Sequence, residues 1–128
     1  MAGEFRSIGE NAATMYDAPS VKANKLFVAS VLYPVEVIVQ VDNWVKVRDQ
    51  AGDLAWVEKK ALSEAHTVVV TANLANVLQS ADDSAPTAFQ ARKGVALEIA
   101  ELAAGAWVKV RHRDGQTGFV RANQVWGL

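Results

Sequence analysis

Hydrophobic and polar residues alternate along several short stretches of the chain. Residues 35–41 read Val-Glu-Val-Ile-Val-Gln-Val, an alternating run that is rich in β-branched side chains. Residues 44–48 follow, and they alternate in the same way. Val45 and Val47 lie on one face, and a tryptophan, a lysine and an arginine lie on the other. Such alternation predicts half-buried strands. No stretch has a convincing helical period over three turns, so we expect an all-β protein with one short 3₁₀ turn at each of 59–62 and 122–125.

An internal repeat relates the two halves of the chain. Residues 44–62 read WVKVRDQAGDLAWVEKKAL, and residues 107–125 read WVKVRHRDGQTGFVRANQV. A repeat at a fixed period indicates that one small structural unit is used twice. The positions that are identical in register are Trp44/Trp107, Val45/Val108, Lys46/Lys109, Val47/Val110, Arg48/Arg111, Gly52/Gly115 and Val57/Val120.

The repeat also sets the expected domain boundaries. From Phe5 to Glu36 the halves align at an offset of 62, and the offset then becomes 63. We place the extra residue in 103–106, because a hairpin loop there tolerates an insertion. The sequence therefore predicts domains at 5–63 and 67–128, each near the lower size for a self-supporting core. The junction at 64–66 is short, which favours a fixed tandem over freely rotating domains.

The turn inside the repeated hairpin can be predicted from the faces of its strands. A two-residue loop at Asp114-Gly115 would mix inner and outer side chains. A three-residue loop that begins at Arg113 pairs Val108 with Val120 and keeps all inner residues on one face. We therefore expect Gly115 to take the left-handed conformation of a bulged hairpin. The predicted inner residues are Val45, Val47, Val57, Val108, Val110 and Val120.

Composition and charge narrow the functional classes. The hydrophobic fraction of 51% argues against disorder, and a net charge of −1 argues against nucleic acid as the main partner. No apolar run reaches the roughly 18 residues that would span a bilayer. The chain has no cysteine, which removes disulfides, thiolate zinc sites and cysteine nucleophiles. His66 and His112 lie in separate segments without a carboxylate pattern, and no nucleophile–base motif is found, so we predict a non-enzyme without metal or cofactor.

Short motifs recur in the same order in both halves of the chain. The first half contains ATMYDAPS at 13–20, VEV at 35–37, NWVKV at 43–47 and LAWV at 54–57. The second half contains ANVLQSAD at 75–82, ARKG at 91–94, LEI at 97–99, AWVKV at 106–110 and TGFV at 117–120. Together these motifs resemble the bacterial SH3-like domain, SH3b, over almost the whole chain. The resemblance implies a fold of two tandem SH3-like small β-barrels.

The resemblance also implies a function. Bacterial SH3 domains often occur in exported proteins, so it implies a non-enzymatic binding or targeting module of the cell envelope that recognises peptidoglycan or an envelope protein. The alternative is a cytoplasmic peptide-binding adaptor or scaffold, because residues 13–17 resemble the ALYDY motif of eukaryotic SH3 domains.

The first ten residues lack a signal-sequence pattern. We expect a periplasmic or otherwise exported protein whose signal peptide has been removed, with a cytoplasmic location as the alternative.

Aromatic residues supply the candidate ligand-binding set. Tyr16 and Asp17 match the motif position that lines an SH3 groove, and the other members lie on the strand face opposite the valines. We expect binding on the first copy or at a groove between the copies, because tyrosine and tryptophan give large contact area at low entropic cost. The alternative is structural: the rings are covered by a loop or fill the contact between the copies, with Lys46 beside Trp56. The full set is Tyr16, Asp17, Trp44, Trp56, Trp107 and Phe119.

Overall fold

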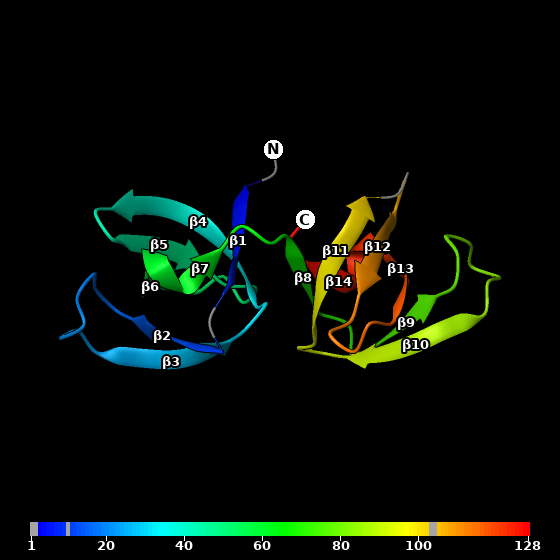
Figure 1. Ribbon diagram of the computed structural model, residues 1–128, viewed down its shortest axis with the longest axis horizontal. Coiled ribbons are helices and arrows are strands. Elements are labelled where there is room, and N and C mark those ends of the chain that lie inside the picture. The colour runs from blue at the N-terminus through cyan, green and yellow to red at the C-terminus, as the bar shows by residue number, and fades with distance from the viewer. Residues whose placement is uncertain (1–2, 10, 103–104) are drawn as a thin grey trace. The chain divides into compact units, whose positions relative to one another are not determined.

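The protein folds into two compact units whose boundary falls between His66 and Thr67 (Figure 1). The computed structural model describes residues 3–9, 11–102 and 105–128. Within these ranges every regular element is a strand or a single 3₁₀ turn, which confirms the all-β prediction. The insertion expected at 103–106 lies partly outside the described residues, and the exact domain limits stay predictions.

Unit 1 is one antiparallel sheet in the order β3-β2-β6-β5-β4-β1-β7. Its last long strand runs directly into a 3₁₀ turn, as the sequence predicts. The elements are β1 (Glu4–Ile8), β2 (Ala12–Tyr16), β3 (Lys25–Ser30), β4 (Pro34–Val41), β5 (Trp44–Arg48), β6 (Leu54–Glu58), η1 (Lys59–Ala61) and β7 (Leu62–Ser63).

Unit 2 repeats this topology in the order β10-β9-β13-β12-β11-β8-β14. Each strand of unit 2 has the same place in its sheet as the corresponding strand of unit 1, as the internal repeat requires. The elements are β8 (Thr67–Val70), β9 (Leu74–Leu78), β10 (Thr87–Arg92), β11 (Ala96–Leu102), β12 (Trp107–Arg111), β13 (Thr117–Arg121), η2 (Ala122–Gln124) and β14 (Val125–Trp126).

The two sheets match the predicted pair of tandem SH3-like domains, but neither sheet closes into a barrel among the described residues. The outermost strands of unit 1, β3 and β7, do not pair with each other. Strands β2 and β6 are joined at one residue pair, Tyr16 with Trp56, beside a register shift in the pairing of β2 with β3. A bulge increases the bend of a strand. Each sheet therefore folds over its core while its edges stay apart.

The predicted hairpin register is confirmed in both units. Val108 lies opposite Val120, and Lys109 lies opposite Phe119. The backbone N–H of His112 donates to the carbonyl of Gln116 at 2.8 Å, which leaves a three-residue loop. Gly115 has a φ of 95°, the left-handed region that the bulged hairpin requires. In unit 1 the same register sets Lys46 opposite Trp56.

The cores of both units include the residues that alternation assigned to the inner face. The six predicted inner valines are each at most 3% exposed, which confirms that prediction. Ile8 and Met15 are the largest fully buried side chains of the unit 1 core, and Leu97 is the largest of the unit 2 core. The opposite face of the same strands is therefore free to carry the aromatic and charged side chains.

In the described ranges the structure has no helix that is long and apolar enough to cross a membrane.

Candidate functional site

Three of the predicted site residues meet on the outer face of unit 1. Tyr16, at the end of β2, lies opposite Trp56 of β6 in the sheet. Its ring also packs edge-on against Trp44 of β5, with centroids 5.4 Å apart and an interplanar angle of 82°. Tyr16 is 8% exposed, whereas both tryptophans are only partly buried. The tyrosine ring thus supports the Trp44 indole, and both tryptophans remain partly accessible to solvent.

A groove of about 180 Å³ runs beside this cluster, and we call it the unit 1 groove. It lies between β2 and the end of β6 with its 3₁₀ turn. One wall is charged, because Lys60 Nζ and Glu58 Oε2 form an ion pair of 3.7 Å. Its lining residues are Ala12, Ala13, Thr14, Tyr16, Val57, Glu58, Lys60 and Ala61.

A larger groove of about 360 Å³ lies at the equivalent place in unit 2, and we call it the unit 2 groove. Five of its positions correspond in the repeat to lining positions of the unit 1 groove, so the hollow is a recurrent property of this fold. Its chemistry has diverged: amide side chains replace alanine, threonine and lysine. The lining residues are Asn76, Leu78, Asp83, Trp107, Arg121, Asn123 and Gln124.

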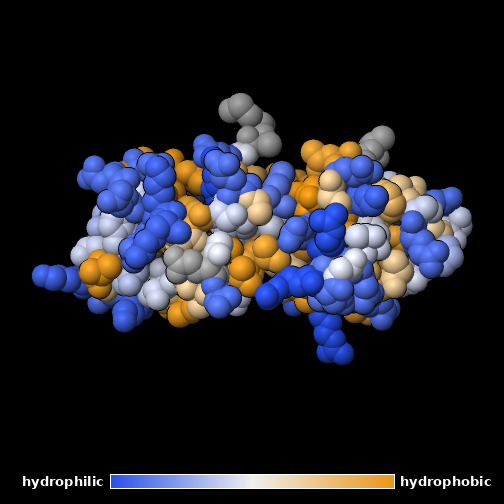
Figure 2. All heavy atoms as spheres, viewed as in Figure 1, coloured by the Kyte–Doolittle hydropathy of each residue, from blue (hydrophilic) through white to orange (hydrophobic). Residues whose placement is uncertain are grey.

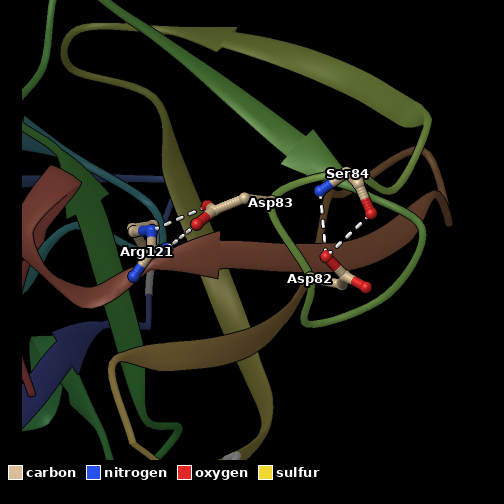
Figure 3. A network of polar contacts seen from close by, with 4 residues as sticks. All are labelled: Asp82, Asp83, Ser84 and Arg121. Atoms are coloured by element: carbon tan, nitrogen blue, oxygen red, sulfur yellow. Dashed lines mark hydrogen bonds and ion pairs between the residues drawn. The ribbon is translucent and has the colours of Figure 1, made fainter.

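In unit 2, cations take the place of the edge-on aromatic pair. Arg121 lies over the Trp107 ring at 4.5 Å, and Lys109 Nζ lies 5.9 Å from the centroid of Phe119. The Lys109 contact is the cross-strand neighbour that the register predicts. Arg121 also forms two hydrogen bonds with Asp83, one of them from Nε to Oδ1 at 3.2 Å (Figure 3). These bonds to Asp83 raise the pKa of Arg121, so its positive charge is secure.

Asp17 has a local role in the structure. Its carboxylate accepts hydrogen bonds from the backbone N–H of Asn24 at 3.0 Å and from the Asn24 amide at 3.1 Å. The backbone N–H of Asp17 donates to the Asn24 carbonyl, so the two residues close the loop between β2 and β3. The side chain is not among the described residues that line the unit 1 groove. Its predicted contact with a ligand stays a prediction.

Each histidine lies against an aromatic ring. His112 Nδ1 accepts a hydrogen bond from the backbone N–H of Asp114 at 3.2 Å, and its ring meets Phe89 edge-on at 6.0 Å. His66 stacks on Phe5 at 6.5 Å. Within the part of the chain that the structure describes, no three histidine or carboxylate side chains are arranged to hold a metal ion.

Surface hydropathy alone does not mark a site. On the face shown in Figure 2, hydrophobic residues reach the surface of both units among hydrophilic ones. In unit 1 the edge strand β3 exposes Leu26, Phe27 and Val28, and this strand pairs with β2, which carries Tyr16. The recurrent grooves are therefore the better guide. The sequence predicts the aromatic residues of these grooves, Tyr16 and Trp107, but not the Arg121–Asp83 pair. The amide side chains of the unit 2 groove could have been found from the differences between aligned positions of the repeat.

Comparison with solved structures finds similar arrangements at low sequence identity. The chain is similar to NlpC2 from Trichomonas vaginalis, with 14% identity and a TM-score of 0.43, over 98% of this chain and 48% of that one. It is similar to NlpC1 from the same organism, with 15% identity and a TM-score of 0.44, over 98% of this chain and 46% of that one. An NlpC/P60 family protein from Bacillus cereus ATCC 10987 has 18% identity and a TM-score of 0.44, over 95% of this chain and 55% of that one. The chain thus spans about half the length of these proteins.

Comparison with curated proteins found no significant match. Comparison with protein families gave a clear result. The bacterial SH3 domain family matches twice, at residues 9–64 and 71–127, which together cover most of the chain. Each match covers all strands of one sheet except the first strand, β1 or β8. The chain therefore belongs to the bacterial SH3 domain family and carries two copies of the domain.

Proposed function

We propose that the chain is a non-enzymatic binding module of the bacterial cell envelope that recognises peptidoglycan or an envelope protein. The main observation that supports this proposal is the groove that recurs at equivalent residues of both units. Domains of this family are typically cell-wall binding modules and are usually non-catalytic. They are also often found in exported proteins, which supports an exported location for this chain.

The aromatic cluster beside the unit 1 groove is the proposed centre of recognition. Trp44 and Trp56 are partly accessible, and Tyr16 holds Trp44 by an edge-on contact. A rigid aromatic surface loses little conformational entropy when a ligand covers it, so such side chains dominate the binding energy at many interfaces. The adjacent Glu58–Lys60 pair supplies polar groups at the rim.

We expect Trp44→Ala and Trp56→Ala each to weaken binding to purified cell wall by at least roughly 30-fold, the effect of losing a hot-spot residue. The melting temperature should stay within a degree or two, because both rings are only partly buried. The measurement is a sedimentation binding assay on purified cell-wall material, with thermal unfolding of each variant alongside. Leu54→Ala is the matched control, because this exposed apolar residue lies on the same strand as Trp56.

Two results would contradict the assignment. If both tryptophan variants unfold the protein, the rings are structural; Tyr16→Phe then separates the roles, because it keeps the ring and removes only the hydroxyl. If the variants stay folded and bind the wall as the parent does, the proposed surface is wrong. The adaptor alternative is tested by titrating a proline-rich peptide while following the Trp44 indole NMR signal. No shift at millimolar peptide removes that alternative.

A further inference from the structure

The unit 2 groove contains an arginine, Arg121, whose guanidinium is fixed in a geometry that suits an anion. One face of the Arg121 guanidinium lies on the Trp107 ring at 4.5 Å. Its edge donates two hydrogen bonds to the Asp83 carboxylate, as Figure 3 shows. A guanidinium fixed by stacking presents its fork of donors in one plane, which is the geometry that binds a carboxylate through two parallel bonds.

Asp83 is a readily displaced partner. Its side chain is 74% exposed and belongs to the loop between β9 and β10. An exposed ion pair of this kind contributes little to stability, because water screens both charges. Another carboxylate of similar geometry can therefore replace Asp83 at small cost.

The loop keeps its shape by contacts that do not involve the Asp83 side chain. The Asp82 carboxylate accepts hydrogen bonds from the backbone N–H and the hydroxyl of Ser84, both at 2.9 Å. These bonds lower the pKa of Asp82, the backbone bond more than the hydroxyl. The backbone N–H of Gln79 also bonds the Pro86 carbonyl across the base of the loop. A change at Asp83 should therefore leave the loop intact.

The remaining groove wall suits a peptide backbone. Asn76, Asn123 and Gln124 line it, and each amide group offers both donors and acceptors. The Gln90 amide donates a hydrogen bond of 2.8 Å to Asn76 Oδ1, which orients the Asn76 side chain. The groove volume of about 360 Å³ lies in the range of small-ligand sites.

Unit 1 has neither half of the ion pair. Val21 stands at the repeat position of Asp83, and Glu58 stands at that of Arg121. Val21 is exposed, and the negative charge of Glu58 would repel a carboxylate. Any anion site of this type is therefore confined to unit 2.

We propose that the unit 2 groove binds the free C-terminal carboxylate of a short peptide. The ligand carboxylate replaces Asp83 on Arg121, and the preceding peptide groups lie along the three amide side chains. In the absence of ligand, the Asp83 carboxylate occupies the place of the ligand carboxylate on Arg121. This inference rests on the proposed binding role of the chain and adds a second ligand class to it.

The test is an NMR titration of the full chain with N-acetyl-Ala-Ala-Ala as the free acid, as the C-terminal amide, and with acetate alone. We expect the acid to shift the Arg121 Nε–H and Trp107 indole signals, and the amide to bind at least about tenfold more weakly, because it lacks the charge that pairs with Arg121. Acetate should bind more weakly than the acid if the amide wall contributes. Asp83→Asn should tighten binding of the acid roughly two- to five-fold, because it removes the competing carboxylate.

The controls use the matching positions of both units. Arg121→Gln should abolish the difference between acid and amide, whereas Val21→Asn in unit 1 should leave acid binding unchanged. Equal binding of acid and amide, weaker binding by Asp83→Asn, or unchanged binding by Arg121→Gln would each overturn the inference. A chain that binds cell wall through Trp44 but ignores the acid peptide overturns only this inference. A chain that binds the acid peptide but not the wall or an envelope protein overturns the proposed function.

Discussion

Leu97→Ala is expected to lower the free energy of unfolding of unit 2 by about 2–5 kcal/mol, the range for a leucine truncated in a closed core. Leu97 is 0% exposed and lies opposite Val68 of the neighbouring strand. A unit of about 60 residues has a total stability of only about 3–9 kcal/mol. The substitution should therefore leave unit 2 close to unfolded. Urea unfolding, together with amide hydrogen exchange in β11 and β12, measures the effect.

Leu102→Ala is the matched control for that result. It makes the same chemical change on the same strand, but Leu102 is 67% exposed. A surface substitution of this kind changes the stability by no more than about 0.5 kcal/mol. If the two variants lose similar stability, the core of unit 2 does not lie where the burial of Leu97 places it.

The inner valines and the hairpin register could be predicted because they depend on local rules. Side chains alternate strictly along a strand, so a run such as residues 107–111 can place its valines inside in only one way. A one-residue slip would turn every valine outward, which makes the register a consequence of burial. Gly115 then had to supply the positive φ of the turn. The repeat added a second, independent copy of the same pattern.

That each sheet stays open could not be predicted, because the bend of a sheet depends on a few irregular positions. The register shifts between Val37 and Val39 and again between Ile99 and Glu101. Bulges of this kind bend a strand without leaving a pattern in its alternation. The single Tyr16–Trp56 pair that joins two parts of the sheet is equally invisible in the sequence.

The candidate site was partly predictable for a related reason. Strand phase placed Trp44, Trp56 and Trp107 on the outer face, where the structure has them partly buried. The contact between Asp83 and Arg121 spans 38 residues and depends on the conformation of a loop. Loop conformation has no periodic signal, so no pattern in the sequence joins these two side chains.

Gly118→Ala is expected to destabilise unit 2 by about 1–3 kcal/mol, the cost of overpacking a closed site. A Cβ at this position would lie 2.7 Å from the backbone oxygen of Leu78 and 2.7 Å from Val77 Cγ1. The oxygen belongs to β9 and cannot rotate away as a flexible side chain would. The strand must shift, and with it Asn76 and Leu78 of the unit 2 groove. Thermal unfolding measures the loss, and the Trp107 indole signal reports the change at the groove.

The sign of the stability change in Gly118→Ala distinguishes a steric clash in the folded state from a loss of backbone freedom in the unfolded chain. Where the added methyl meets no obstacle, Gly→Ala stabilises a protein by about 0.4–1 kcal/mol, because the unfolded chain loses freedom. The equivalent position in unit 1 is Ala55, which is 4% exposed, so that unit already accommodates the methyl group. Ala55→Gly should therefore destabilise unit 1. Gly118→Ala adds a methyl group and Ala55→Gly removes one, yet we expect each to lower the stability of its unit. A rise in the melting temperature of Gly118→Ala would show that β9 and β13 do not approach as closely as the structure has them.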